Sequence, residues 1–243
     1  MAANRSTLRS ALASWWREQR NEKSGLDTAC LLISIFWEFL RDSLPNRRRQ
    51  RYGDVDFDWE HHVDTTSATV GWRTRLMGLL SSPYQPIPPE EFRELMSALS
   101  IDLSRFTFID VGSGKGRALL LAAQYSFRRI IGVELLPELN RIAQANIERL
   151  QQKCSLSGHL ELVCMDATEF AFPAEPTLIF LFNPLAQNAL RKLLGNLEES
   201  LRRNPRPVYL AYANPTLEDV IVNCSFLVRY HKTPLYALFR NAT

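Results

Sequence analysis

From residue 106 onward the chain alternates short, continuous apolar runs with longer amphipathic stretches. Continuous apolar runs are typical of strands that are buried on both faces, as in a parallel sheet covered by helices. The runs are residues 106–111, 129–133, 160–164, 177–182 and 207–212. Between them, apolar side chains recur at helical spacing. This alternation predicts an α/β fold with a doubly wound, mostly parallel sheet.

The end of the chain has a different pattern. Two further apolar runs, 226–230 and 235–239, are separated only by the four residues HKTP. This connection is too short for a crossover helix, so the two runs should form an antiparallel hairpin. Together with the five earlier runs, they predict a seven-stranded, Rossmann-like sheet whose C-terminal hairpin contributes an antiparallel strand.

The first 100 residues have another texture. Helical spacing predicts amphipathic helices over residues 6–20 and 27–44. Residues 51–73 are polar, aromatic and unpatterned, which indicates a long loop region. Residues 81–92 hold four prolines and should be extended until a helix begins near Pro89. We therefore expect an N-terminal helical extension with a lid and acceptor-side segment (1–100), followed by a ligand-binding domain (101–243).

Composition excludes several classes of protein. With 46% hydrophobic and 23% charged residues, the 243-residue chain should fold around a real core. A formal net charge of +3 gives no argument for nucleic acid, and we expect no DNA partner. The cysteines show no metal-ligand spacing, so no metal site is expected, and they fit free thiols in a cytoplasmic protein. They are Cys30, Cys154, Cys164 and Cys224.

The apolar stretch LLISIFWEFL at residues 31–40 is too short to span a bilayer and carries Glu38. Four arginines follow it between residues 47 and 51. Residues 27–51 could therefore lie on an anionic membrane surface. The alternative, which we prefer, is a helix packed on the domain and followed by a solvated charged turn.

A glycine-rich stretch, TFIDVGSGKGR, occupies residues 107–117. A phosphate-binding loop needs Ser or Thr directly after its Gly-Lys pair, whereas Gly116 follows Lys115 here. A nicotinamide dinucleotide loop needs G-x-G-x-x-G, and its pyrophosphate would lie unfavourably near the carboxylate of Asp110. A phosphate-binding loop is thus excluded, and a nicotinamide dinucleotide is kept only as an alternative ligand. We expect Lys115 and Arg117 at the surface, at the start of a helix.

A third ligand, S-adenosylmethionine, carries a cationic sulfonium and an amino acid in place of a pyrophosphate. Asp110 could contact its ammonium directly or through water, and the glycines allow close backbone approach. Glu134 ends the second run, where a carboxylate can accept both ribose hydroxyls. Asp166 follows the third run, where it can accept from the adenine amine beside the Ala167 amide. Taken singly, Glu134 or Asp166 could equally be a helix cap or a solvated loop residue.

These stretches together resemble the class I S-adenosylmethionine-dependent methyltransferase superfamily. The resemblance rests on IDVGSGKGR, VELLPEL, CMDATEF and FLFNPL and covers residues 106 to about 215. It implies S-adenosyl-L-methionine as cofactor and a set of binding residues. These are Asp110, Gly112, Ser113, Gly114, Gly116, Glu134, Leu135, Asp166, Ala167, Asn183, Tyr84, Gln85 and Pro86.

Two segments carry the expected catalytic residues Asn183, Pro184 and Tyr84. YQPIPPEEF resembles the Y-x-P-T segment of non-SET histone-lysine-type methyltransferases, which lies over the cofactor's methionine end, but Ile87 replaces the threonine. FNPL resembles the N/D-P-P-Y/F segment whose carbonyls accept from a target nitrogen, although Leu185 replaces its second proline. The chain as a whole resembles a group of bacterial methyltransferase-like proteins.

Two histidines, His61 and His62, lie in the unpatterned region and could act as an acceptor-side base or as structural residues. The resemblance implies transfer of a methyl group to an acceptor. Among acceptors we place a protein side-chain nitrogen first, a small molecule second and RNA third. The alternatives are a non-catalytic module that binds S-adenosylmethionine and an NAD-dependent oxidoreductase.

Overall fold

The computed structural model describes Trp16 and residues 24–42, 55–66, 86–153, 159–182 and 185–242. The chain forms two compact units. One comprises Met1–Gly53 and Ser67–Gln85, and the other comprises Asp54–Thr66 and Pro86–Thr243. The division of the chain into an extension and a domain at residue 100 remains a prediction.

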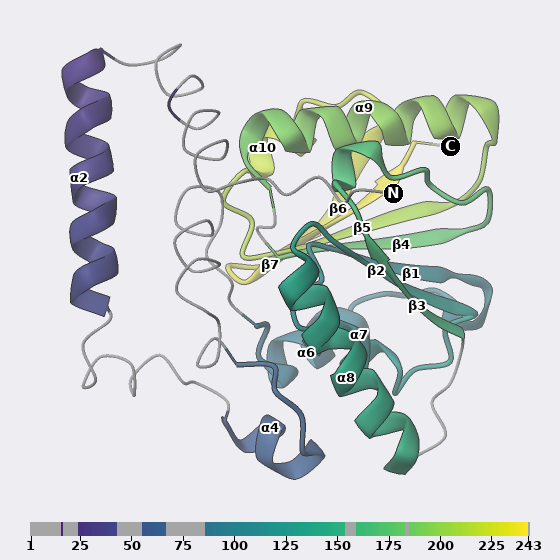
Figure 1. Cartoon of the computed structure of the whole chain (residues 1–243). Coiled ribbons are helices and arrows are strands. Elements are labelled where there is room, and N and C mark those ends of the chain that lie inside the picture. Colours follow the sequence, from purple (N-terminus) through teal and green to yellow (C-terminus); the bar gives the residue numbers. More distant parts are fainter. Residues whose placement is uncertain are drawn as a thin grey trace, which may run out of the picture. The chain divides into compact units, whose positions relative to one another are not determined.

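The larger unit is built on a seven-stranded sheet with the strand order β3-β2-β1-β4-β5-β7-β6 (Figure 1). The strands are β1 (Thr107–Val111), β2 (Arg129–Glu134), β3 (His159–Cys164), β4 (Thr177–Phe182), β5 (Val208–Ala213), β6 (Leu227–Lys232) and β7 (Tyr236–Asn241). The first five run parallel to one another, and β7 is antiparallel to both β5 and β6. The doubly wound sheet and its C-terminal hairpin are confirmed. The reversed strand lies one position inside the edge, because β6 forms the edge itself.

Helices cover both faces of the sheet (Figure 1). In the larger unit they are α4 (Val55–His61), α6 (Pro89–Ser97), α7 (Arg117–Ala122), α8 (Pro137–Lys153), α9 (Gln187–Arg203) and α10 (Glu218–Val222). Two 3-10 turns, η2 (Leu103–Arg105) and η3 (Ala167–Glu169), complete the set. Successive strand residues point to opposite faces. Accordingly Phe108 packs with α6 and α7, whereas Ile109 and Val111 pack with α9.

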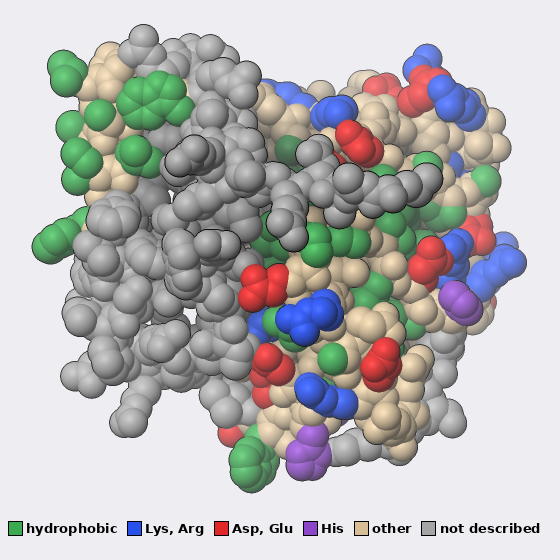
Figure 2. Space-filling model, viewed as in Figure 1, with side chains coloured by type: hydrophobic (Ala, Val, Ile, Leu, Met, Phe, Trp, Pro, Cys, Tyr) green, Lys and Arg blue, Asp and Glu red, His purple; other side chains and the backbone are tan. Residues whose placement is uncertain are grey.

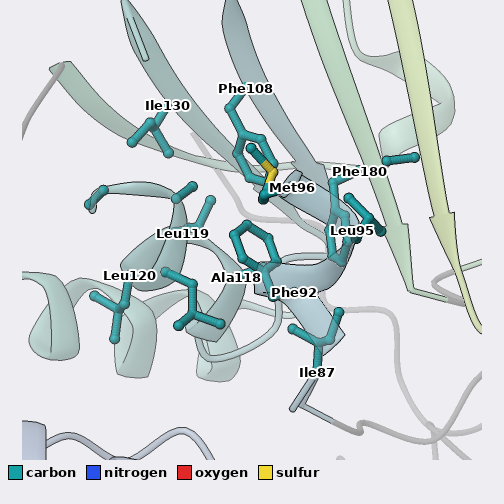
Figure 3. Close-up of a cluster of buried hydrophobic side chains, with 14 of the residues drawn as sticks. Ile87, Phe92, Leu95, Met96, Phe108, Ala118, Leu119, Leu120, Ile130 and Phe180 are labelled. Atoms are coloured by element: carbon teal, nitrogen blue, oxygen red, sulfur yellow. The ribbon is translucent and has the colours of Figure 1, made fainter. Parts of the chain in front are cut away.

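The core under α6 and α7 explains one departure from the expected motif. Ile87 is 2% exposed and belongs to the cluster that contains Phe92, Leu95 and Phe108 (Figure 3). Pro89 begins α6 two residues later. Position 87 favours an apolar side chain because this side chain is buried in the hydrophobic core. A threonine would carry a hydroxyl into that cluster.

Helix prediction succeeded where apolar spacing was clear and failed where it was not. The helix near Pro89 is confirmed, and the helix predicted over 27–44 corresponds to α2 (Gly25–Asp42). The region 51–73 was predicted wrongly as loop throughout, because α4 occupies part of it. Seven residues give too short a window for periodicity to show. The helix predicted over 6–20 lies outside the described residues, apart from Trp16.

Helix α2 belongs to the smaller unit and is described by itself. Leu26, Ile33 and Trp37 are 81%, 68% and 68% exposed, and their spacing places them on one face of the helix. Figure 2 shows hydrophobic side chains at the surface of α2. Within the described ranges, no helix is both long enough and apolar enough to cross a membrane.

Candidate functional site

The glycine loop joins β1 to α7 and has a backbone that favours glycine. The φ angles of Gly112, Gly114 and Gly116 are 74°, 54° and 86°, a region in which a Cβ atom is strained. The backbone amides of Gly112 and Ser113 donate to the Val133 carbonyl at 2.8 and 3.1 Å. The loop is thereby held against the end of β2, and its shape requires the spacing that the sequence shows.

Glu134 closes the loop from the side of β2. Its Oε2 accepts a hydrogen bond from the Gly114 amide at 2.8 Å, and its Oε1 accepts from the Leu136 amide at 2.8 Å. The side chain is 6% exposed, and burial raises the pKa of its carboxyl. The Leu135 amide also contributes a hydrogen bond to this carboxylate, which has about four lone pairs, so an acceptor position remains for a ligand hydroxyl.

Asp110 stands beside Glu134 at the carboxyl end of β1. It is 4% exposed, and no donor among the described residues forms a hydrogen bond with its carboxyl group. Burial, with a smaller contribution from the charge of Glu134, raises its pKa to about 8. A buried carboxyl group without a donor is expensive to ionise. It is therefore suited to a ligand that brings a cation or a hydrogen-bond donor to it.

The third predicted acid takes a different position. Asp166 is exposed and accepts from the Thr168 amide at 2.8 Å, so it caps η3, which is one of the two alternatives to ligand binding that the sequence left open. Its other carboxylate oxygen carries no hydrogen bond from the described residues. Ala167 is 7% exposed, and Leu135 is 57% exposed directly after Glu134. The residues directly after β2 and β3 thus offer an exposed apolar side chain, that of Leu135, and an exposed carboxylate, that of Asp166.

The residues at the ends of β1, β2 and β3 fit S-adenosylmethionine better than a phosphate ligand. Ligands of open α/β sheets bind outside the carboxyl ends of the strands, where these residues lie. Two buried carboxyl groups, on Asp110 and Glu134, oppose a pyrophosphate and favour a cation. Residues 109–202 match a family model described as a methyltransferase domain.

Residues 109–202 thus form a methyltransferase domain of the class I S-adenosylmethionine-dependent superfamily. The strand order and the reversed strand β7 agree with this assignment. The fold and the cofactor class expected from the sequence are thus confirmed.

Individual relatives of this methyltransferase differ in what they modify. A protein-lysine N-methyltransferase of Saccharolobus islandicus is 29% identical over 127 residues, which cover 52% of this chain and 74% of that protein. An uncharacterized RNA methyltransferase of Chlamydia trachomatis is 28% identical over 222 residues, covering 86% of this chain but only 51% of that protein. A solved RNA methyltransferase from Salinibacter ruber, in complex with S-adenosyl-L-homocysteine, has a TM-score of 0.42 at 20% identity and covers 64% of this chain and 91% of that one.

The two cations of the glycine loop are not surface residues, contrary to our expectation. Lys115 and Arg117 are 0% and 1% exposed. Lys115 Nζ lies 2.7 Å from Asp64 Oδ1, and Arg117 Nη2 lies 3.1 Å from Asp58 Oδ1. The two acids belong to the region taken for an unpatterned loop. Sequence periodicity carries no information about such pairs, which are more than forty positions apart.

Asn146 is a further residue that the sequence did not single out. It is 0% exposed on α8, and its Nδ2 donates to the carbonyls of Asp64 and Lys115 at 2.8 and 3.0 Å. Its Oδ1 accepts from the Asp64 amide at 2.8 Å. A polar residue in an otherwise apolar helix face is the only signal that could have drawn attention to it.

The remaining predicted site residues divide into two groups. His61 stacks on Phe57 with ring centroids 4.3 Å apart, and its Nδ1 lies 3.0 Å from the Phe57 carbonyl oxygen, so it serves the end of α4. His62 is exposed with a φ angle of 53°. Pro86 is half-buried. Four predicted site residues lie outside the described residues: Tyr84, Gln85, Asn183 and Pro184. Among the described residues, no cluster of His, Cys, Asp or Glu could bind a metal ion.

Proposed function

We propose that this protein is an S-adenosylmethionine-dependent methyltransferase whose acceptor is a nitrogen of a protein side chain. The cofactor assignment is supported most by the pair of buried carboxyl groups, Asp110 and Glu134, beside a loop whose three glycines have positive φ angles. A methyl donor of this class carries a cationic sulfonium and an ammonium group. An uncompensated carboxyl group such as Asp110 gains most from such a neighbour.

In this proposal each residue holds one part of the cofactor. Asp110 faces the amino acid end, Glu134 accepts from the ribose hydroxyls, and the exposed Leu135 covers the adenine ring. Asp166 and the Ala167 amide address the adenine edge, with Asp166 using the carboxylate oxygen that does not cap η3. When bound, the cofactor supplies a methyl group on a sulfur that leaves as a neutral thioether.

The chain's own contribution to transfer is alignment and the exclusion of water. A lysine side chain must lose a proton before its nitrogen can attack, so the acceptor side needs an acceptor for that proton or access to solvent. In this proposal Asn183 and Pro184, directly after β4, orient the nitrogen through backbone carbonyls. Tyr84 is assigned to the acceptor side on the resemblance of YQPIPPEEF to the Y-x-P-T segment.

Two observations favour a protein acceptor. The segment Tyr84–Gln85–Pro86 matches that of non-SET histone-lysine-type methyltransferases, and one relative is a protein-lysine N-methyltransferase. RNA is the second candidate, since the two matched chlamydial proteins are RNA methyltransferases and align with 86% and 87% of this chain. Against RNA stands the small net charge of +3, which gives little attraction for a polyanion.

Cofactor binding is tested by calorimetry with S-adenosylhomocysteine on wild type and Glu134→Ala. Glu198→Ala, an exposed acid on α9, is the matched control. We expect the Glu134 variant to bind at least about tenfold more weakly, which corresponds to a loss of about 1.4 kcal/mol, and the control to bind normally. Unchanged affinity in Glu134→Ala would remove the ribose assignment. Thermal protection by NAD in place of S-adenosylhomocysteine would favour the oxidoreductase.

The acceptor is tested with methyl-labelled cofactor and a fractionated lysate. Label that is lost after protease but survives nuclease supports a protein acceptor, and the reverse supports RNA. Label confined to small molecules would contradict both. Binding of cofactor with no transfer in any fraction is the result expected of a non-catalytic module.

A further inference from the structure

Residues 55–66 form a short helix and an extended tail that pack on the glycine loop and its neighbouring helices, and we call them the clasp segment. Phe57 and Val63 are 6% and 8% exposed and join the same apolar cluster as α6 and α7. This apolar contact holds the clasp segment on the sheet domain. Polar side-chain contacts between the clasp segment and the glycine-rich stretch 107–117 are made by Lys115 and Arg117.

Arg117 contacts three residues of the clasp segment, Phe57, Asp58 and Thr65. Its Nε donates to Thr65 Oγ1 at 2.6 Å, and its Nη2 donates to Asp58 Oδ1 at 3.1 Å. Its guanidinium carbon lies 4.8 Å from the centroid of the Phe57 ring, within the range of a cation–π contact. Asp58 Oδ2 in turn accepts from the amides of Thr65 and Thr66 at 2.7 and 2.9 Å. The end of the clasp segment is thereby fixed around one buried cation.

Lys115 fixes the last residues of the same segment. Its Nζ donates to Asp64 Oδ1 and to the Thr66 carbonyl, both at 2.7 Å. Asn146 joins the two partners, because it bonds the backbone of Asp64 and also the Lys115 carbonyl. The clasp segment, the glycine loop and α8 are thus connected through one buried set of hydrogen bonds.

The glycine loop is consequently held by two sets of contacts. Gly112, Ser113 and Gly114 donate to β2, through the Val133 carbonyl and the Glu134 carboxylate. Lys115 and Arg117 bind the clasp segment instead. A displacement of the clasp segment would act on the backbone between Gly114 and Gly116, where the two glycines allow the loop to change shape at low steric cost.

We propose that Lys115 and Arg117 are positioning residues that couple the clasp segment to the cofactor loop, so that cofactor binding and clasp docking strengthen each other. The coupling rests on the proposed function, because it uses S-adenosylmethionine as the ligand of the loop. Neither side chain touches the cofactor in this scheme. Each acts through the backbone of the loop that the cofactor contacts.

The coupling has a consequence for the acceptor side. Thr66 is held by Lys115, and Ile87 is buried in the core, so residues 67–86 connect two points anchored on the sheet domain. Tyr84, Gln85 and Pro86 belong to this connection. The clasp segment therefore ends directly before the stretch of sequence that contains these expected acceptor-side residues.

Binding and hydrogen exchange test the coupling together. We expect S-adenosylhomocysteine to slow amide exchange in residues 55–66 of the wild type. Asp64→Asn and Lys115→Met should remove that protection and weaken binding by about tenfold, since binding free energies are coupled reciprocally. Matched controls are Asp56→Asn, an exposed acid of the clasp segment, and Lys192→Met, an exposed lysine on α9. Both controls should behave as wild type.

The outcomes separate the coupling from a merely structural role. If the Lys115 variant fails to fold, Asp64→Asn still decides, because the Asp64 side chain is 31% exposed and tolerates a neutral group of the same size. Variants that melt earlier yet keep wild-type affinity and wild-type ligand-induced protection would overturn the coupling alone. A wild type that does not bind S-adenosylhomocysteine would overturn the proposed function, and the coupling with it.

Discussion

The carboxylate of Glu134 accepts the amide hydrogen of Gly114 at 2.8 Å, so the acid that ends β2 also shapes the loop that follows β1. One side chain thereby links two elements that the sequence presents as separate motifs. Its second oxygen accepts from the Leu136 amide at 2.8 Å, and the group is 6% exposed. Loop conformation therefore depends on the same buried group to which the proposed function assigns the ribose hydroxyls.

Replacing that charge by an amide should damage both. Glu134→Gln has the same size but only one acceptor oxygen, so one of the two amide donors, on Gly114 or Leu136, loses its partner. We expect the free energy of unfolding to fall by about 1–3 kcal/mol, the cost of an unsatisfied buried group. Denaturant titration measures this, with Glu198→Gln as the control. A Gln variant as stable as wild type would show that the loop does not need the carboxylate.

Asp110 should make stability fall with rising pH. Its pKa is raised to about 8 in the folded protein, compared with about 3.9 in an unfolded chain. Between these values the folded state binds more protons than the unfolded state, so this group's contribution to stability is greatest below about pH 4 and is lost as pH rises to about 8.

The matching variant is Asp110→Asn, which cannot titrate. The unfolding free energy of the variant minus that of the wild type should increase from pH 5 to pH 8 and then level off. Denaturant unfolding without cofactor at pH 5, 7 and 9 measures this difference. A constant difference across the range would mean that Asp110 ionises normally in the folded protein.

Cofactor binding should release protons near neutral pH. If a cationic ligand group comes next to Asp110, its pKa falls and the proton held at pH 7 is lost. Affinity for S-adenosylmethionine should then rise between pH 6 and pH 8. Calorimetry in two buffers of different ionisation enthalpy measures the release, which Asp110→Asn should abolish. Equal proton release in the variant would assign the effect to another group, such as Glu134.

Gly132 on β2 should tolerate no side chain, although no motif contains it. A Cβ atom there would lie 2.5 Å from Leu119 Cδ1 and 2.9 Å from both Leu162 Cδ2 and Ser113 Oγ. We expect Gly132→Ala to destabilise by about 1–3 kcal/mol through overpacking. Gly195→Ala on α9 is the control, since nothing lies within 4 Å of its Cβ position. Alanine should stabilise that helix by up to about 1 kcal/mol, so the two variants should shift the melting temperature in opposite directions.

Restoring the threonine of the Y-x-P-T segment should harm the protein. Ile87→Thr puts a hydroxyl into the cluster around Phe92, where Ile87 is 2% exposed. We expect a loss of roughly 2–4 kcal/mol, from lost apolar contact and an unpaired hydroxyl. Ile87→Val isolates the first effect, at about 0.5–1.5 kcal/mol. A threonine variant as stable as the valine variant would show that the hydroxyl finds a partner.

The sequence by itself determined the sheet, the glycine loop and the acids at its strand ends. Buried parallel strands are continuous apolar runs, and the ends of all seven predicted runs, including the two of the hairpin, lie within two residues of those of the observed strands. The left-handed glycines and the acids at the carboxyl ends of β1 and β2 are local features, lying within or next to the strands that position them. Local features of this kind can be predicted from the sequence without knowledge of the fold.

Only the tertiary structure decided what Lys115 and Arg117 do. Their charge and their place after a glycine predicted exposure, because an isolated cation costs too much to bury. Their partners Asp64 and Asp58 remove that cost, but they lie in a stretch without periodicity, far away in the chain. The same is true of Asn146, whose hydrogen bonds go to Asp64 and Lys115. Pairing between distant polar groups is a property of the packed chain, and hydrophobic patterning contains no trace of it.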